Sequence, residues 1–434
     1  MFFLLQVLFV VGFLLSSPFY VLKMLRRGNF ARGFWQRFAI YSADLRREAG
    51  NGGFVWIQAV SVGEARVALL LINRLRRRWP DLRIALSTTT STGQALARKQ
   101  APPGTLVIYF PLDFLPFVNG ALNLLRPRLV VVVETEVWPT LVLQSKRRGV
   151  PVVMVNGRMS EKSFRGYRCL DGLSRRVFGA FDLVCAQGAR DAERYRKLGA
   201  REAALRTTGS LKFDDALAPS PAGAKAKEFL RACGADGGRP VWVCGSTHAG
   251  EEEIVFRVFR GLHAKFPSLF LVLAPRHPER TRQVVAVAER CGVSLTLRSE
   301  PPRAGADCLL LNTTGELKAF YELATVIFVG KSLRGRGGQN IIEAAASDAP
   351  VLFGPAMQNF EAIADDFVRA GAGVQVADEA ALRSALEDLL AKPERRREIA
   401  GRARQVIAQG SGAAERTLEA MAELVKSEKL KIKS

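Results

Sequence analysis

The sequence predicts an α/β protein built from two Rossmann-like, doubly wound domains of similar size. From about residue 54 onward, short apolar runs alternate with amphipathic helical stretches, a rhythm typical of a parallel sheet covered by helices on both faces. The rhythm stops once, at residues 215–225, where "DALAPSPAGAK" is rich in small residues and proline and is typical of a linker. A length of 434 residues and a hydrophobic content of 48% suffice for two separate cores.

These observations divide the chain into successive parts. We expect a membrane anchor at 1–22, a basic juxtamembrane segment at 23–53, a first domain at 54–214, the linker at 215–225, and a second domain with C-terminal helices at 226–434. Two such domains on one linker are expected to face a cleft. Ligands of open parallel sheets bind at the carboxyl ends of the strands, so polar residues at those ends are the candidates for a site.

The expected anchor is the stretch "MFFLLQVLFVVGFLLSSPFYVL", which carries no charge over 22 residues. As a helix it would extend about 33 Å, close to the thickness of a bilayer core. Basic residues do not precede it, and they follow it at positions 23, 26, 27, 32 and 37, which predicts that the body of the protein stays in the cytoplasm. Pro18 and two serines weaken a spanning helix and leave a shallow interfacial anchor as the alternative.

The charge of the chain bears on its partners. A net charge of +22 points to a polyanion, which can be nucleic acid, anionic lipid or a phosphorylated substrate. No basic-aromatic RNA-binding motif is present, so we expect no nucleic-acid partner, whereas anionic lipids of the membrane are expected to attract the basic surface. Six cysteines without CxxC spacing and three distant histidines indicate neither a disulfide framework nor a metal site.

The first domain is expected to begin with a buried strand at residues 54–60, "FVWIQAV", which are apolar and in part β-branched or aromatic. Apolar residues then recur at helical spacing at positions 67, 70, 71 and 75, which predicts an amphipathic helix. Further strands are expected at "IALST", "LVIYF", "LVVVVE", "VPVVMVN" and "DLVCAQ".

Glu64 lies between that first strand and its helix. With Ser61 three residues before it, Glu64 forms a capping box, in which each side chain satisfies an orphan amide of the first turn. The carboxyl end of a strand is also a place where a side chain faces a ligand. The local sequence therefore leaves two roles open, a helix cap and a catalytic group.

Further polar residues stand at corresponding positions. Glu134 and Glu136 follow a strand in "VVVETEVWP", and Lys212 stands just before the linker in "GSLKFDD". Their spacing alone does not distinguish functional groups from solvated loop acids and a surface lysine.

The second domain repeats the pattern, with strands expected at "VWVC", "LFLVLAP", "CLLLN", "TVIFVG", "APVLFG" and "GVQV". The loop from Gly245 to His248 follows the first of these strands and can offer amides to a phosphate. The glutamates after this loop suit a helix dipole and need no further function. Arg276 and His277 end the next strand and are a plausible pair for a phosphate or a base edge.

The segment "GRGGQNIIEAAA" at 335–346 is the most specific in this domain. Its glycines allow the backbone to approach a ligand, and a helix is expected to begin near Asn340. Asn340 and Glu343 are three residues apart and share a helix face. A carboxylate placed there can accept both hydroxyls of a ribose. Two Rossmann-like domains with this element resemble glycosyltransferases of the GT-B architecture, which use nucleotide-activated sugars without a bound metal.

The chain as a whole resembles one family, the 3-deoxy-D-manno-octulosonic acid (Kdo) transferases of lipopolysaccharide synthesis. The likeness rests on motifs in the family's order along nearly the whole chain: "SVGE", "ETEVWP", "NGRMSEKS", "GSLKFD", "GSTHAGEEE", "APRHPER", "TGEL" and "GGQNIIE". It implies an inverting enzyme on the cytoplasmic face of the bacterial inner membrane. That enzyme would transfer Kdo from CMP-Kdo to a lipid A precursor and release CMP, without a cofactor or metal.

The resemblance also implies roles for single residues. Glu64 matches the proposed general base that deprotonates the acceptor hydroxyl, and Glu136 and Lys212 match residues held to stabilise the transition state. The segments that bind CMP-Kdo are matched by Pro275, Arg276, Thr314, Gly315, Glu316, Asn340, Ile341, Ile342 and Glu343. These matches favour a base over a cap for Glu64, because one carboxylate cannot easily do both. The first domain would then bind the acceptor and the second CMP-Kdo.

Some positions depart from the family's pattern. Gln339 stands where many members have histidine, and Asn312 and Thr314 stand where aspartate and methionine are usual; these departures bear on donor affinity more than on activity. One alternative is another GT-B transferase or an epimerase that uses a UDP-sugar, and donor choice distinguishes it. The other is a catalytically silent membrane protein that binds anionic glycolipid, and a turnover assay distinguishes it.

Overall fold

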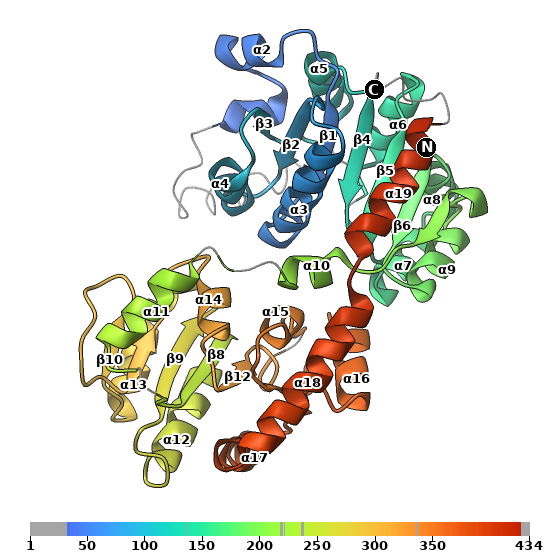
Figure 1. The fold of residues 1–434 in the computed structure, drawn as a ribbon. Coiled ribbons are helices and arrows are strands. Elements are labelled where there is room, and N and C mark those ends of the chain that lie inside the picture. Colours follow the sequence, from blue (N-terminus) through green and yellow to red (C-terminus); the bar gives the residue numbers. More distant parts are fainter. Residues whose placement is uncertain are drawn as a thin grey trace. The chain divides into compact units, whose positions relative to one another are not determined.

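The computed structural model describes residues 33–135, 137–217, 220, 222–235, 238–335 and 337–426. The described residues form two compact units (Figure 1). One unit contains the chain up to Leu211 together with the segment from Ser411, and the other contains Lys212–Gly410. The predicted anchor at 1–22 and the adjoining residues up to 32 lie outside the described residues.

The first unit is built on a 7-stranded parallel sheet of order β3-β2-β1-β4-β5-β6-β7. The strand order changes direction between β1 and β4, which is the topological switch point of a doubly wound sheet. The edge strand β7 was missed from the sequence because its three residues are largely exposed and form no apolar run. The strands are β1 (Val55–Ala59), β2 (Ile84–Thr88), β3 (Thr105–Tyr109), β4 (Leu129–Val133), β5 (Val152–Gly157), β6 (Leu183–Ala186) and β7 (Leu205–Thr207).

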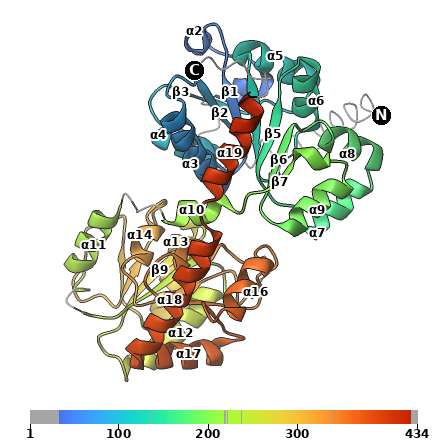
Figure 2. The same cartoon turned by 45° about the vertical axis from the view of Figure 1, so that its right-hand side comes forward.

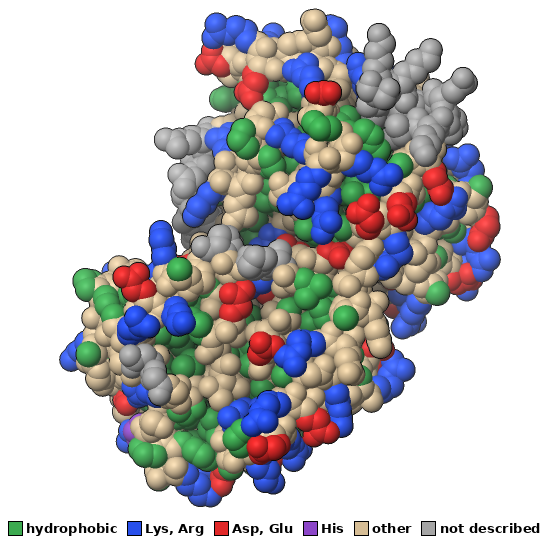
Figure 3. All heavy atoms as spheres, viewed as in Figure 1, with side chains coloured by type: hydrophobic (Ala, Val, Ile, Leu, Met, Phe, Trp, Pro, Cys, Tyr) green, Lys and Arg blue, Asp and Glu red, His purple; other side chains and the backbone are tan. Residues whose placement is uncertain are grey.

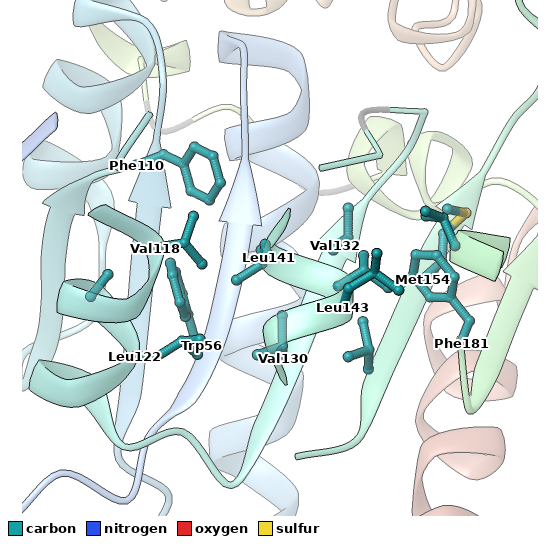
Figure 4. Packing of buried hydrophobic residues seen from close by; sticks show 14 of the residues in the cluster. Trp56, Phe110, Val118, Leu122, Val130, Val132, Leu141, Leu143, Met154 and Phe181 are labelled. Carbon is teal, nitrogen blue, oxygen red and sulfur yellow. The ribbon is translucent and has the colours of Figure 1, made fainter. Parts of the chain in front are cut away.

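Helices cover both faces of this sheet. On one face, Trp56 of β1 packs against Phe110, with ring centroids 6.1 Å apart, and α5 and α6 close the core (Figure 4). The helices are η1 (Phe34–Phe38), α2 (Ala43–Ala49), α3 (Val62–Arg78), α4 (Ser91–Gln100), α5 (Leu115–Leu125), α6 (Pro139–Arg147), α7 (Glu161–Arg168), α8 (Asp171–Phe178), α9 (Ala189–Lys197) and η2 (Glu202–Ala204).

The C-terminal helix α19 (Ala413–Lys426) belongs to the first unit, whereas the predicted boundaries placed all of 226–434 in the second domain. It packs against α3 and β6 of the first unit, as both views of the fold show (Figures 1 and 2). Leu418 and Met421 of α19 join the same core as Val67 and Leu71 of α3. The helical spacing of its apolar residues predicts a buried face, but that spacing carries no information about which domain buries it.

Among the residues of the predicted linker at 215–225 that the structure describes, several are helical. Helix α10 (Leu211–Leu217) runs into it, and α11 (Gly223–Ala232) begins within it. Lys318 donates to the carbonyl oxygen of Asp215 at 2.8 Å. The carboxylate of Glu322 accepts from the Ser220 amide at 3.1 Å. Side chains distant in sequence therefore hold this segment to the second unit.

The second unit contains another 7-stranded parallel sheet, of order β10-β11-β9-β8-β12-β13-β14, with its switch point between β8 and β12. The three-residue strand β10 was missed from the sequence. The strands are β8 (Val241–Thr247), β9 (Phe270–Pro275), β10 (Leu295–Leu297), β11 (Cys308–Leu310), β12 (Val326–Val329), β13 (Val351–Phe353) and β14 (Val374–Gln375). The helices are α12 (Glu251–His263), η3 (Pro278–Arg280), α13 (Thr281–Arg290), α14 (Leu317–Tyr321), α15 (Ile342–Ala345), α16 (Glu361–Arg369), α17 (Glu379–Ala391) and α18 (Pro393–Gly410). The predicted class of two doubly wound α/β domains is confirmed.

The end of the predicted basic segment, residues 33–53, folds onto the first unit. The Gln36 side chain accepts from the Tyr109 amide at 2.8 Å, and the Arg37 guanidinium donates to the Thr89 carbonyl at 2.9 Å. Among the helices that the structure describes, none has the length and apolar character needed to cross a bilayer. Lys and Arg side chains occur on both units and are interspersed with Asp and Glu on the face shown in Figure 3.

Candidate functional site

Two polar residues that the sequence singled out in the first unit, Glu64 and Glu134, follow neighbouring strands at the switch point of its sheet. Strands β1 and β4 are hydrogen-bonded neighbours with parallel direction, so their carboxyl ends lie at the same edge. Glu64 follows β1 in the first turn of α3, and Glu134 follows β4 directly. This edge is where open α/β sheets bind ligands. Glu136 lies outside the described residues.

Glu64 does form the predicted helix cap. The Ser61 hydroxyl accepts from the Glu64 amide at 3.5 Å and donates to Oε1 of Glu64 at 3.1 Å. Oε2 of Glu64 accepts from the amide of Val60 at 2.6 Å, and the side chain is only 8% exposed. Both oxygens of Glu64 thus take part in the cap, and its role as a base stays a prediction.

A buried polar cluster connects β4, β5 and the start of α10. Asn156, at the end of β5, donates from Nδ2 to Oε1 of Glu134 at 3.2 Å and accepts at Oδ1 from the Leu211 amide at 2.9 Å. Glu134 and Asn156 have positive φ angles, 62° and 55°, in the left-handed region that non-glycine residues rarely adopt. Such strained residues cluster at functional sites. Sequence reasoning missed Asn156, although an Asn-Gly pair ending a strand was an available signal.

Lys212 directly follows Leu211 in α10 and is the first residue of the second unit. Its side chain is half-buried, and its Nζ lies 5.9 Å from the centroid of the Phe360 ring. An ammonium group at this distance from an aromatic face is held by a weak cation–π attraction. The surroundings of Lys212 are thus ordered, unlike those of a solvated surface lysine.

In the second unit, the loops after β8 and β12 meet at the other switch point. Ser246, near the end of β8, and Lys331, after β12, both have φ of 58°. The His248 imidazole lies 5.6 Å from that of His277 between ring centroids, and its Nδ1 lies 3.2 Å from the Ser246 carbonyl oxygen. Burial, with Lys331 nearby, lowers the pKa of His248 and so favours its neutral form.

Gly245 shows why the end of β8 is rich in small residues. A Cβ at Gly245 would lie 1.9 Å from the Tyr321 hydroxyl, so only glycine fits there. Tyr321 is 3% exposed, and burial, with Glu343 nearby, raises its pKa well above the usual value. The tyrosine therefore stays neutral between Gly245 and the segment that carries Glu343.

The predicted nucleotide-binding residues lie on three loops of this unit. Pro275 is buried as the last residue of β9, while the side chain of Arg276 is exposed and its amide donates to the Thr247 carbonyl at 2.9 Å. Thr314 and Gly315 are exposed after β11. Glu316 pairs with Arg298 at 2.7 Å and accepts from Thr313 at 2.5 Å. The two carboxylate oxygens of Glu316 thus bind Arg298 and Thr313, so a ligand would more readily contact the backbone of Glu316.

The third loop ends in α15, which begins at Ile342 as the sequence predicted for the region of Asn340. Oδ1 of Asn340 accepts at 3.1 Å from the amide of Ile342, the first residue of this short helix. Ile341 and Ile342 are fully buried, so a ligand can meet only their backbone. Glu343 is half-buried in the first turn. Of this motif, Asn340 and Glu343 thus offer side chains to a ligand.

Metal ligands do not gather at either switch point: the described part of the chain contains no group of three or more His, Cys, Asp and Glu side chains placed to hold an ion. The first edge offers carboxylates and the second offers backbone amides and cations. That division suits a base that activates a hydroxyl and a site that holds a phosphate.

Comparison with known proteins gives one family. The model of the family "3-Deoxy-D-manno-octulosonic-acid transferase (kdotransferase)" matches residues 32–215. A 3-deoxy-D-manno-octulosonic acid transferase of Bordetella pertussis is 35% identical over 426 residues, which cover 93% of this chain and 96% of that protein. The enzyme of the same name from Haemophilus influenzae is 33% identical over 369 residues, covering 84% and 86%.

Among solved structures, the S. aureus MnaA–UDP co-structure is similar with a TM-score of 0.58, at 15% identity, and covers 86% of this chain and 97% of that one. At this identity the likeness concerns the fold, and it agrees with two Rossmann-like domains of the GT-B architecture. The sequence relatives extend over both units and both switch points, and they share one activity in name. The chain belongs to the family of 3-deoxy-D-manno-octulosonic acid transferases.

Proposed function

We propose that this protein transfers Kdo from CMP-Kdo to a hydroxyl of a lipid A precursor, with inversion at the anomeric carbon and release of CMP. The observation that carries the proposal is that a relative named as a Kdo transferase, that of Bordetella pertussis, matches over 93% of the chain. The described residues of the family's motifs lie at the carboxyl ends of β1, β4, β5, β7, β8, β9, β11 and β12.

In the proposed reaction, a carboxylate oxygen of Glu64 takes the proton of the acceptor hydroxyl. The hydroxyl oxygen forms a bond to the anomeric carbon of Kdo, and the bond between that carbon and the phosphate oxygen of CMP breaks. The electron pair leaves with CMP, whose phosphate gains negative charge. Lys212, Arg276 and the loop amides of the second unit would stabilise that charge without a metal.

Product analysis tests this function directly. Purified protein is incubated with CMP-Kdo and a lipid A precursor, and the lipid is weighed by mass spectrometry. We expect a mass increase of one or more Kdo residues and release of CMP. UDP-sugars in place of CMP-Kdo should give no product. Binding without turnover would instead support a silent glycolipid-binding protein.

Glu343→Ala should weaken donor use. If the carboxylate binds ribose hydroxyls, its loss costs about 1.5–3 kcal/mol, the range for hydrogen bonds to a charged group, or roughly 10- to 150-fold in the donor KM. Steady-state kinetics with varied CMP-Kdo measure this. Glu361→Ala, an exposed acid in the first turn of α16, is the matched control. An unchanged donor KM in Glu343→Ala would place the ribose elsewhere.

The membrane location is also a proposal: a bacterial inner-membrane protein anchored by residues 1–22, with its body in the cytoplasm beside anionic lipid. The full chain should sediment with inner membranes at moderate salt. Deletion of residues 1–22 should release part of it, and the rest should leave the membrane as salt screens the basic surface. Recovery of the intact protein mainly in the soluble fraction would contradict the anchor.

A further inference from the structure

Glu251 is a carboxylate that none of the roles above uses. It is the first residue of α12, after β8, and its side chain is completely buried. The sequence attributed it to the helix dipole together with Glu252 and Glu253. Those two have basic partners: Glu252 pairs with Arg280 at 2.7 Å, and Glu253 pairs with Arg257. Glu251 is bound differently.

Its hydrogen-bond donors are backbone amides of two loops. Oε1 accepts from the amides of residues 332–334, at 3.0, 3.0 and 3.3 Å. Oε2 accepts from the amides of Lys331 at 2.6 Å and His248 at 3.0 Å. Successive amides that converge on one anion form a nest, and hydrogen bonds to an ionised acceptor are about twice as strong as neutral ones. The buried charge is thereby compensated, and the path of both loops depends on it.

The neighbouring backbone packs closely around Glu251 and restricts movement of the two loops that it binds. A Cβ at Gly330 would lie 2.6 Å from the Cα of Thr247 and 2.9 Å from Oε2 of Glu251. Lys331 adopts a left-handed conformation, with φ of 58°, directly after that glycine. The carboxylate thus fixes how the chain leaves β12, relative to the end of β8.

The loop that Glu251 holds leads into the glycine segment before Asn340. The Ser332 carbonyl accepts from the Ala356 amide at 2.9 Å, and its hydroxyl accepts from the Gly354 amide at 2.8 Å, which joins the loop to the end of β13. A Cβ at Gly337 would lie 3.8 Å from Nζ of Lys331, so this ammonium lies beside the glycine segment. A phosphate is bound by a cation together with backbone amides that can approach it closely.

We propose that Glu251 is a positioning residue for the nucleotide-sugar donor. Its buried carboxylate holds the loops after β8 and β12 so that Lys331, His248 and the amides of the glycine segment are arranged for the donor phosphate. Glu251 itself touches no substrate, because its oxygens face the protein backbone. The inference rests on the proposed use of CMP-Kdo and adds the group that organises its phosphate site.

Glu251→Gln tests the inference in the full-length protein. The side-chain amide has the same shape, but its NH₂ group replaces an accepting oxygen and faces backbone donors. We expect the Kd for CMP and the KM for CMP-Kdo to rise roughly tenfold or more, as for loss of hydrogen bonds to a charge. The acceptor KM and the kcat at saturating donor should stay within about threefold of wild type. Glu253→Gln, exposed in the same turn, is the matched control and should behave as wild type.

A second variant decides the matter if Glu251→Gln does not fold. Gly330→Ala places a methyl group against Oε2 and should raise the same two donor constants, while Gly401→Ala, an uncrowded helical glycine in α18, should not. A folded Glu251→Gln, or failing that a folded Gly330→Ala, with CMP affinity within about twofold of wild type overturns the inference. Equal rises in donor KM and acceptor KM would also overturn it, because they indicate a change that is not confined to the donor site, and so would a fall in kcat with both KM values unchanged. Wild-type protein that does not turn over CMP-Kdo would contradict the proposed function instead.

Discussion

Glu64→Gln is expected to lower turnover by roughly 10²–10⁴-fold, the usual contribution of a general base. Glutamine has the size of glutamate, and its carbonyl oxygen can still accept from the Val60 amide that Oε2 now binds at 2.6 Å. Its NH₂ group can donate to Ser61 Oγ, which now donates to Oε1 at 3.1 Å. Helix α3 should therefore form, with stability lowered by no more than about 1 kcal/mol from the lost charge–dipole interaction. Affinity for CMP should be unchanged, since the nucleotide contacts are assigned to the second unit.

Ser61→Ala is the control that separates the two roles of this carboxylate. It removes the N-cap of α3 but keeps the base, so it should lower stability by about 0.5–2 kcal/mol and leave most of the turnover. A thermal melt, a CMP titration and a turnover assay on the same preparations give the comparison. Near-normal turnover in folded Glu64→Gln would assign Glu64 to the cap alone and move the search for a base to Glu136.

The fold could be predicted wherever a local sequence pattern determines the secondary structure. Buried parallel strands need continuous apolar runs, and each strand of that kind was found, including Leu129–Val133 at the center of the first sheet. The edge strands β7 and β10 have three residues each and contain exposed or half-buried positions, so no local pattern marks them. Helix α19 packs on α3, and tertiary packing rather than the local sequence determines which of the two domains it joins.

The residues of the candidate site also divide into those that a local motif marks and those that depend on tertiary contacts. Glu64, Arg276 and Glu343 could be proposed from the sequence because each follows a strand or opens a helix in a recognisable motif. Asn156 and Glu251 were not assigned a role because their partners are far away in the chain: Asn156 binds the amide of Leu211, and Glu251 binds amides about 80 residues further on. A buried polar residue of this kind acts through the backbone it holds, and sequence spacing does not show which backbone that is.

Lys212→Met should have the second large effect, a fall in kcat of about 10²–10³-fold, the usual cost of removing one donor that stabilises charge in a transition state. Methionine keeps most of the length of lysine and removes only the ammonium. The backbone at this point is held independently, because Asn156 accepts from the amide of the preceding residue at 2.9 Å, so α10 should remain in place.

The measurement is kcat with both substrates saturating, beside a thermal melt and a CMP titration. Lys212→Arg keeps the charge on a longer, planar group and should fall between wild type and Lys212→Met. Lys225→Met, an exposed lysine on α11, has the same change in net charge and should keep wild-type kcat. If folded Lys212→Met retained wild-type kcat, the charge of the leaving phosphate would be met by Arg276 and Lys331, and Lys212 would be a structural residue of α10.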